Sequence, residues 1–286
     1  MKLYSLETGN FKIDAGPMFG VIPKTMWSKV CQSDENNLCV LANRCLLCET
    51  ESKLILIDVG IGNKVSEKAV MQSQIDTSRN IVSELLNHGF KPEQVTDVIL
   101  THLHWDHCGG AVDYNNGVKG DFKRVFPNAI HHISRKQWEW AVNPNKREAA
   151  AYPPEYILPL EDYDLNLVEA PGEIIPGIEI FFSDGHTPGQ IIPVINAGNF
   201  KIAFGGDLVS SSAHVSLLWI PAYDIYPLSS IDEKEKFLKD CLDNNIYILF
   251  EHDPVCEAAS LQEGTKGPEI KECLTLKEIC KRHNAG

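Results

Sequence analysis

Residues 101–110 read Thr101-His102-Leu103-His104-Trp105-Asp106-His107-Cys108-Gly109-Gly110 and place four metal-binding side chains within six positions. The preceding run, 95–100, is apolar and β-branched, which predicts a buried strand leading directly into them. Because strand side chains alternate, His102 and His104 are expected on one side, with Asp106 and His107 on a turn that the two glycines close. We therefore expect two imidazoles to face one metal ion and an Asp–His pair another, a donor set that suits zinc, manganese, iron or cobalt. The alternative, a polar surface turn, is a costly use of three histidines and an aspartate.

The composition is that of an ordinary soluble globular protein. The chain has 286 residues, 43% of them hydrophobic and 23% charged, which fits one large domain or two small ones. The formal net charge of -13 argues against nucleic acid or an anionic membrane as a partner and favours a neutral or weakly charged small-molecule substrate. No apolar run approaches a membrane span, and Met1–Asn10 does not resemble an export signal. These features predict a cytoplasmic location.

The nine cysteines are an odd number spread over a long chain, which disfavours a disulfide framework and predicts reduced thiols. Cys45 and Cys48 form a C-x-x-C pair inside an apolar run. Strand alternation would put the two sulfurs on opposite faces, so core packing is expected, with redox or metal work as the alternatives.

Local patterns predict where strands and helices lie. Strands are expected over 2–14, 38–48, 53–59, 95–100, 125–133, 178–182, 191–195, 201–204 and 246–250, and helices over 78–88, 135–143, 231–242 and 274–282. Residues 16–24 predict an irregular apolar loop, and 146–164 a surface excursion that donates no obvious chemistry. His88, His131 and His132 lack metal-ligand spacing and are expected to be structural.

Further polar residues follow directly after predicted strands, where α/β sheets place their sites. Asp58 begins the sequence Asp58-Val59-Gly60 and is predicted to orient the metal-binding loop through a hydrogen bond, with turn capping as the alternative. His186 or His252 alone would more often be structural, but beside the first motif they predict ligands. The full set suits two ions that share one carboxylate, that of Asp207: His102, His104, Asp106, His107, His186, Asp207 and His252.

The order H-x-H-x-D-H, G-H-T-P-G, G-D and a final histidine resembles the ligand set of the metallo-β-lactamase superfamily. The Asp58-Val59-Gly60 sequence resembles the D-x-G strand end of that family. The resemblance covers nearly the whole chain, so it implies a single domain over 1–286 with an α+β fold, a four-layer αββα sandwich. It also implies the metal ligands: His102, His104 and His186 for the first ion, Asp106, His107 and His252 for the second, and Asp207 as the bridge.

Residues 16–29, 207–214 and 219–227 look like those of the quorum-quenching lactonases, whose relatives include methyl parathion hydrolase. That resemblance implies opening of N-acyl-homoserine lactones by a hydroxide held between two divalent ions, zinc first, with iron, manganese or cobalt as alternatives. One lactonase type has a tyrosine three places after the bridging aspartate, where this chain has Ser210. Catalytic candidates are Asp106, His214 and Tyr223, and acyl-pocket candidates are Met18, Phe19, Leu218, Trp219 and Tyr226. The alternative for Met18 and Phe19 is that they plug the core, and His214 and the two tyrosines could equally be packing.

Other functions share this ligand set. A phosphotriesterase is the nearest rival, followed by another esterase or a thioesterase of the same fold. A β-lactamase is disfavoured because Asp106 occupies a position where a cysteine is expected, and a glyoxalase II or nuclease because the chain is acidic. A metal-stabilised binding protein is the non-enzyme alternative, although structural zinc sites are normally closed. A homodimer is a possible assembly.

Overall fold

The strand ends singled out above belong to two units, and the computed structural model describes residues 1–284 of them. The first unit comprises 1–9, 43–171 and 189–191, and the second comprises 10–42, 172–188 and the residues from 192 onward. Each unit is described by itself.

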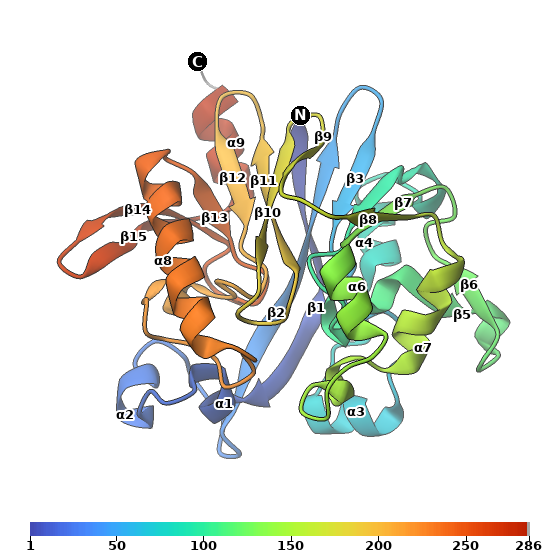
Figure 1. Cartoon of the computed structure of the whole chain (residues 1–286), viewed down its shortest axis with the longest axis horizontal. Helices are drawn as coiled ribbons and strands as arrows, with labels where there is room; N and C mark the ends of the chain where they lie inside the picture. The colour runs from blue at the N-terminus through green and yellow to red at the C-terminus, as the bar shows by residue number, and fades with distance from the viewer. Residues whose placement is uncertain (285–286) are drawn as a thin grey trace. The chain divides into compact units, whose positions relative to one another are not determined.

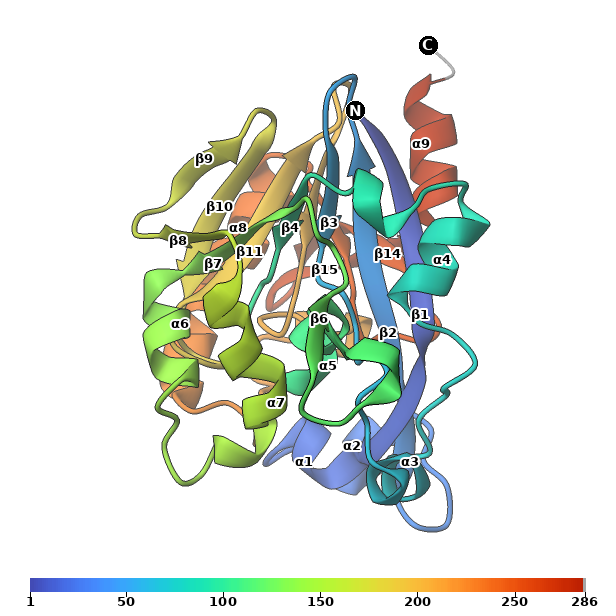
Figure 2. The same ribbon diagram turned by 90° about the vertical axis from the view of Figure 1, so that its right-hand side faces the viewer.

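The sheet that carries the first motif has the strand order β1 (Lys2–Asp14), β2 (Leu38–Glu49), β3 (Leu54–Ile57), β4 (Asp97–Ile99), β7 (Ile130–Ser134) and β8 (Leu165–Val168). Figure 2 shows the long neighbouring strands β1 and β2, which also contain residues of the second unit. The strands β3, β4, β7 and β8 run parallel to one another. Their carboxyl ends therefore meet at one edge, and both Asp58 and residues 101–107 follow strands that end there.

Short helices complete the first unit: α3 (Glu67–Ser73), α4 (Ile81–Asn87), α5 (Trp105–Cys108), α6 (Arg135–Ala141) and α7 (Pro154–Ile157). Helix α6 packs on β7 and β8, and the Ser134 side chain caps it by accepting a hydrogen bond from the backbone N–H of Gln137. A two-stranded hairpin of β5 (Val112–Tyr114) and β6 (Phe122–Arg124) follows the motif. Leu56, Val98 and Leu103 belong to one apolar core cluster, so the strands β3 and β4 and the motif that follows β4 pack on the same core.

The sheet of the second unit has the order β15 (Gly267–Leu274), β14 (Ala258–Gly264), β13 (Tyr247–Leu249), β12 (Lys201–Phe204), β11 (Gln190–Asn196), β10 (Ile178–Ser183) and β9 (Gly172–Ile175). The unit also holds α1 (Ala15–Phe19), α2 (Lys24–Trp27), α9 (Leu276–Asn284) and α8 (Pro227–Asp243), which packs on β14 and β15 (Figure 1). Strands β12 and β13 are parallel, and Phe204 pairs with Leu249. Asp207 and His252 each follow three residues after this pair, so the two loops leave the sheet in the same direction.

Most predicted elements are present, and the differences include the following three. Residues 16–24, predicted to be irregular, contain the end of α1 and the start of α2, because Asp14 caps α1 by accepting a hydrogen bond from the N–H of Gly16. The strand predicted over 125–133 begins only at Ile130. The turn predicted after His104 is the short helix α5, with His104 at its N-cap.

The cysteine prediction was wrong in one place. Cys256 and Cys273 form a disulfide within the second unit, joining the loop after β13 to β15. Cys45 and Cys48 are fully buried in β2, in agreement with core packing. Within residues 1–284, none of the helices combines the length and the apolar character that a membrane crossing requires.

Candidate metal centre

Asp58 is the residue on which the first motif is assembled. It directly follows β3 and has a left-handed backbone (φ 54°), a conformation that aspartate tolerates better than most residues, and its side chain is fully buried. Its carboxylate accepts hydrogen bonds from Thr101 N at 2.7 Å and Thr101 Oγ1 at 2.6 Å, and it lies 3.0 Å from His107 Nδ1. The predicted hydrogen bond from Asp58 to the metal-binding loop is therefore present in the structure.

Glycines allow the motif to lie directly against this strand end. Gly60 has φ +70°, and a Cβ there would lie 2.5 Å from Asn43 Oδ1. A Cβ on Gly110 would lie 2.1 Å from the carbonyl oxygen of Val59. Neither position has space for a side chain, and Gly60 also has a positive φ that favours glycine.

His102 and His104 direct their ring nitrogens at a common point. The single hydroxyl proton of Thr101 goes to the Asp58 carboxylate, so the 3.0 Å contact between Thr101 Oγ1 and His102 Nδ1 requires the ring N–H to donate. His104 Nε2 donates to the Glu148 carboxylate at 3.0 Å. The remaining ring nitrogens, His102 Nε2 and His104 Nδ1, are 3.0 Å apart. When both rings are neutral, each of these nitrogens carries a lone pair, and the pair can share one proton or bind one metal ion.

Asp106 and His107 lie on α5 and form a second pair of donors in the first unit. Nε2 of His107 and Oδ2 of Asp106 are 3.9 Å apart, and the Asp106 backbone carbonyl accepts a hydrogen bond from Asn43 Nδ2 at 2.9 Å. His107 is fully buried, whereas 14% of the Asp106 side chain is exposed. We call His102, His104, Asp106 and His107 the first-unit cluster.

In the second unit, Asp207 presents one carboxylate oxygen to each of two histidines. Oδ2 lies 3.1 Å from His186 Nε2, and Oδ1 lies 3.2 Å from His252 Nε2. We call these three residues the second-unit cluster. A carboxylate that faces a different imidazole with each oxygen has the arrangement required of a ligand shared by two ions.

The outer nitrogens of both histidines are fixed. His186 Nδ1 lies 2.9 Å from Asp224 Oδ1, and His252 Nδ1 donates to the carbonyl of Ala42 at 2.9 Å. Burial by itself lowers the pKa of His186, but attraction to the carboxylates of Asp207 and Asp224 outweighs it and raises the pKa to about 10. The carboxylates thus favour a positive charge at this position, which a divalent ion supplies when it replaces the proton.

The other predicted site residues of the second unit divide into buried and exposed groups. Phe19 is 1% exposed and stacks between the rings of Trp27 and His214, at centroid distances of 5.3 Å from each, with Trp219 at its edge. Met18 is also buried. Residues Leu218, Tyr223 and Tyr226 are 65%, 42% and 46% exposed.

His214 is held by packing and hydrogen bonds. Its Nε2 donates to the carbonyl of Met18 at 3.0 Å, and Nδ1 lies 2.7 Å from Ser211 Oγ. Burial lowers the pKa of His214 to about 4, so the ring is neutral near pH 7 and is not a proton donor in its charged form. This environment favours a packing role, and the catalytic role stays a prediction.

Two carboxylates that contact predicted ligands were missed in the sequence. Glu148 lies in the segment predicted to donate no chemistry, and Asp224 lies in a loop before α8. Neither follows a strand or stands at a fixed spacing from a ligand, so no local pattern marks them. Of the histidines predicted to be structural, His132 pairs with Asp97 at 3.0 Å and His88 is an exposed helix cap.

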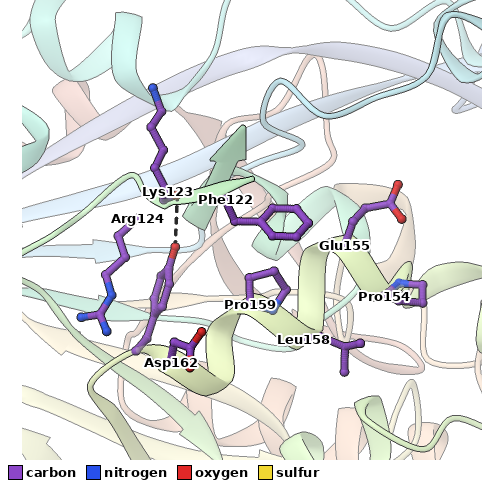
Figure 3. A pocket seen from close by; sticks show the side chains of 9 residues that line it. Phe122, Lys123, Arg124, Pro154, Glu155, Leu158, Pro159 and Asp162 are labelled. Atoms are coloured by element: carbon purple, nitrogen blue, oxygen red, sulfur yellow. Dashed lines mark hydrogen bonds between the residues drawn. The ribbon is translucent and has the colours of Figure 1, made fainter. Parts of the chain in front are cut away.

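A pocket of about 530 Å³ lies elsewhere in the first unit, between β6 and the segment from α7 to Tyr163 (Figure 3). Phe122, Leu158 and Pro159 give it apolar walls, and Lys123 and Asp162 give it charges of both signs. It contains none of the predicted site residues.

Comparison with known proteins identifies one family. The family model described as the metallo-beta-lactamase superfamily matches residues 40–240. A probable metal-dependent hydrolase from Staphylococcus aureus has a structure with a TM-score of 0.87 and 33% identity over 96% of each chain.

Lactonases appear in both kinds of comparison. An N-acyl homoserine lactonase of Bacillus cereus is 32% identical over 169 residues, which is 54% of this chain and 58% of that enzyme. The chain thus spans a little over half the length of the curated relatives it matches. The structure of AidC, a dizinc quorum-quenching lactonase in complex with a product, has a TM-score of 0.78 at 24% identity over 96% of this chain and 95% of AidC.

Proposed function

Because the chain belongs to the metallo-β-lactamase superfamily, we propose that it is a metal-dependent hydrolase in which the first-unit and second-unit clusters together hold two divalent ions. The observation that carries this proposal is the pair of ring nitrogens, His102 Nε2 and His104 Nδ1, that lie 3.0 Å apart. The carboxylate of Asp207, with one oxygen near each of two histidines, is the proposed bridge. Zinc is the first choice for the ions, in keeping with the donor set and with the dizinc relative.

The proposed reaction is the opening of a lactone ring, with N-acyl-homoserine lactones as the substrate class. Two bound divalent ions supply a water-derived nucleophile at neutral pH and polarise a carbonyl group. We assign to Asp106, which is partly exposed beside buried His107, the role of holding a proton and returning it to the leaving oxygen. Asp58, Glu148 and Asp224 keep three imidazoles in fixed orientations, so the ligands need little rearrangement to bind metal.

The relatives with lactonase activity support this substrate class, and the acidic net charge of -13 is compatible with an uncharged lactone. Met18 and Phe19 are too buried to contact a substrate without movement, so exposed Leu218 and Tyr226 are the better candidates for the acyl chain. Phosphotriester hydrolysis is the second candidate function, because the same pair of ions can activate water against phosphorus.

The test has two parts. Elemental analysis of the purified chain should find close to two divalent ions per molecule. A panel of homoserine lactones, simple lactones, thioesters, β-lactams and phosphotriesters should then give the highest kcat/KM for homoserine lactones. A metal-free, inactive protein would refute the hydrolase, whereas a two-metal protein that prefers another class would refute only the substrate assignment.

A further inference from the structure

We propose that Glu148 is a positioning residue that fixes the tautomer of His104 and thereby sets the affinity of the metal position that His104 serves. This inference rests on the metal centre proposed above. Glu148 is 5% exposed and lies just before the short 3-10 helix at Ala149–Ala151, outside the main secondary structure. A carboxylate buried in such a segment is costly unless other groups satisfy it.

Four hydrogen-bond donors surround the Glu148 carboxylate. Oε1 lies 3.0 Å from His104 Nε2 and 2.9 Å from the hydroxyl of Tyr152. Oε2 accepts from Trp140 Nε1 at 2.7 Å and from Asn145 Nδ2 at 3.3 Å. The indole N–H and the amide NH₂ can only donate, so they require an acceptor at both of these contacts.

The backbone around this carboxylate is fixed as well. The side-chain oxygen of Asn145 accepts from the backbone N–H of Glu148 at 3.1 Å. The Tyr152 hydroxyl lies 3.1 Å from Gln137 Oε1 as well as 2.9 Å from Glu148 Oε1, and its one proton serves one of these two acceptors at a time. Gln137 Oε1 also accepts from the N–H of Leu103 at 3.2 Å, so Tyr152 and Gln137 connect the Glu148 segment to the peptide between the two histidines.

A carboxylate at this position allows only one neutral form of His104. Because Glu148 accepts, the ring proton stays on Nε2, and Nδ1 keeps the lone pair that faces His102. A glutamine cannot do the same: its NH₂ group would face either the Trp140 and Asn145 donors or His104 itself. In the second orientation the ring proton moves to Nδ1, where it blocks metal binding.

The experiment uses the full chain loaded with zinc and measures zinc affinity by competition with a chromophoric chelator. We expect Glu148→Gln to lower the affinity of one zinc position by about 10–100-fold. Glu148→Asp keeps the negative charge but moves it away from His104, so it should also lower the zinc affinity of that position. It is the second test variant if Glu148→Gln does not fold. Glu161→Gln, at an exposed position of the same unit, is the matched control and should not change the affinity.

Two further measurements separate positioning from simple structural support. Tyr152→Phe and Trp140→Phe remove donors but leave the His104–carboxylate contact, so they should lower the unfolding temperature with a much smaller loss of zinc affinity. NMR spectra of protein labelled on the histidine ring nitrogens should show a proton on His104 Nε2 in the wild type and a changed pattern in Glu148→Gln.

The outcomes are distinguishable. A wild-type chain that holds no zinc against the chelator would refute the proposed function and this inference together. A wild type that binds two zinc ions, with Glu148 variants of equal affinity and an unchanged His104 tautomer, would refute the inference alone.

Discussion

Nδ1 of His107 lies 3.0 Å from Oδ2 of Asp58, and neither side chain is exposed to solvent. The same carboxylate accepts two hydrogen bonds from Thr101, so one residue at the end of β3 fixes both ends of the metal-binding motif. In this contact the Nδ1–H of His107 donates to Asp58, and the other ring nitrogen, Nε2, lies 3.9 Å from Oδ2 of Asp106. Geometry of this kind raises the basicity of a ligand and lowers the cost of ordering it.

The first prediction concerns Asp58→Asn. The amide NH₂ must face at least one of three donors, so a buried hydrogen bond is lost and the His107 ring is released. We expect metal affinity to fall about 10–100-fold and the unfolding free energy to fall by about 1–3 kcal/mol. Chelator competition and denaturant titration measure the two effects. Asp121→Asn, at an exposed position, is the control, and equal metal affinity in both variants would exclude the orienting role of Asp58.

The second prediction concerns Asp207→Ala. Removing the carboxylate takes one oxygen away from the region of His186 and the other from that of His252. If Asp207 is shared by two ions, the variant should lose most of both and its hydrolytic activity. Elemental analysis and activity assays on the same preparation give the result. The control is Asp240→Ala, on the exposed face of α8, which should keep its full metal content. An Asp207→Ala protein that also keeps its full metal content would disprove the bridging role of Asp207.

The third prediction is a pH dependence of stability from His131. Burial is the main cause that lowers the pKa of His131 from 6.5 to about 4; the backbone of Ala129 and the charge of Asp164 oppose this shift, and His132 and Arg124 add to it. The unfolded state therefore binds this proton at a higher pH than the folded state, so stability is full above pH 6.5 and falls as the pH drops toward 4. From the pKa difference the loss is about 2 kcal/mol at pH 5.

His131→Leu should remove this part of the acid destabilisation. Denaturant unfolding at pH 7.5 and pH 5 should show a smaller decrease for the variant than for the wild type. His88→Leu changes an exposed histidine and should follow the wild type at both pH values. If the wild type and His131→Leu lose equal stability between the two pH values, His131 is not the group that titrates.

The local sequence patterns predicted those features of the fold and site that depend only on residues close together in the chain. The apolar run before residue 101, the Asp58-Val59-Gly60 turn and the ligands after β12 and β13 were visible because strand periodicity and turn glycines are local properties. The metallo-β-lactamase fold was predicted from the order of these motifs, and the family match and the structural relative at 33% identity confirm it.

What the sequence did not reveal depends on distant contacts. Glu148 orients His104 from 44 residues away, and Asp224 orients His186 from 38 residues away, so spacing carries no signal for either. The loop pattern around Phe19 predicts either a plug of the core or a wall of a pocket, and no local signal decides between them. In the structure Phe19 stacks on Trp27 and His214, a contact that only the folded second unit creates.

The last prediction concerns the disulfide that the cysteine count did not suggest. Cys256 follows four residues after His252, and its N–H donates to Asp253 Oδ1 at 2.7 Å, so the bond to Cys273 anchors the loop that carries His252. The bond spans 17 residues, and a loop of that size is worth about 3 kcal/mol by restriction of the unfolded chain. Cys273→Ser should therefore unfold at a lower temperature than the wild type, and reductant should lower the wild type to the same value without affecting the variant. Cys280→Ser removes a free thiol of α9 and should keep the response of the wild type to reductant. A wild type whose unfolding temperature is unchanged once mass spectrometry shows both thiols reduced would mean that the bond does not stabilise this loop.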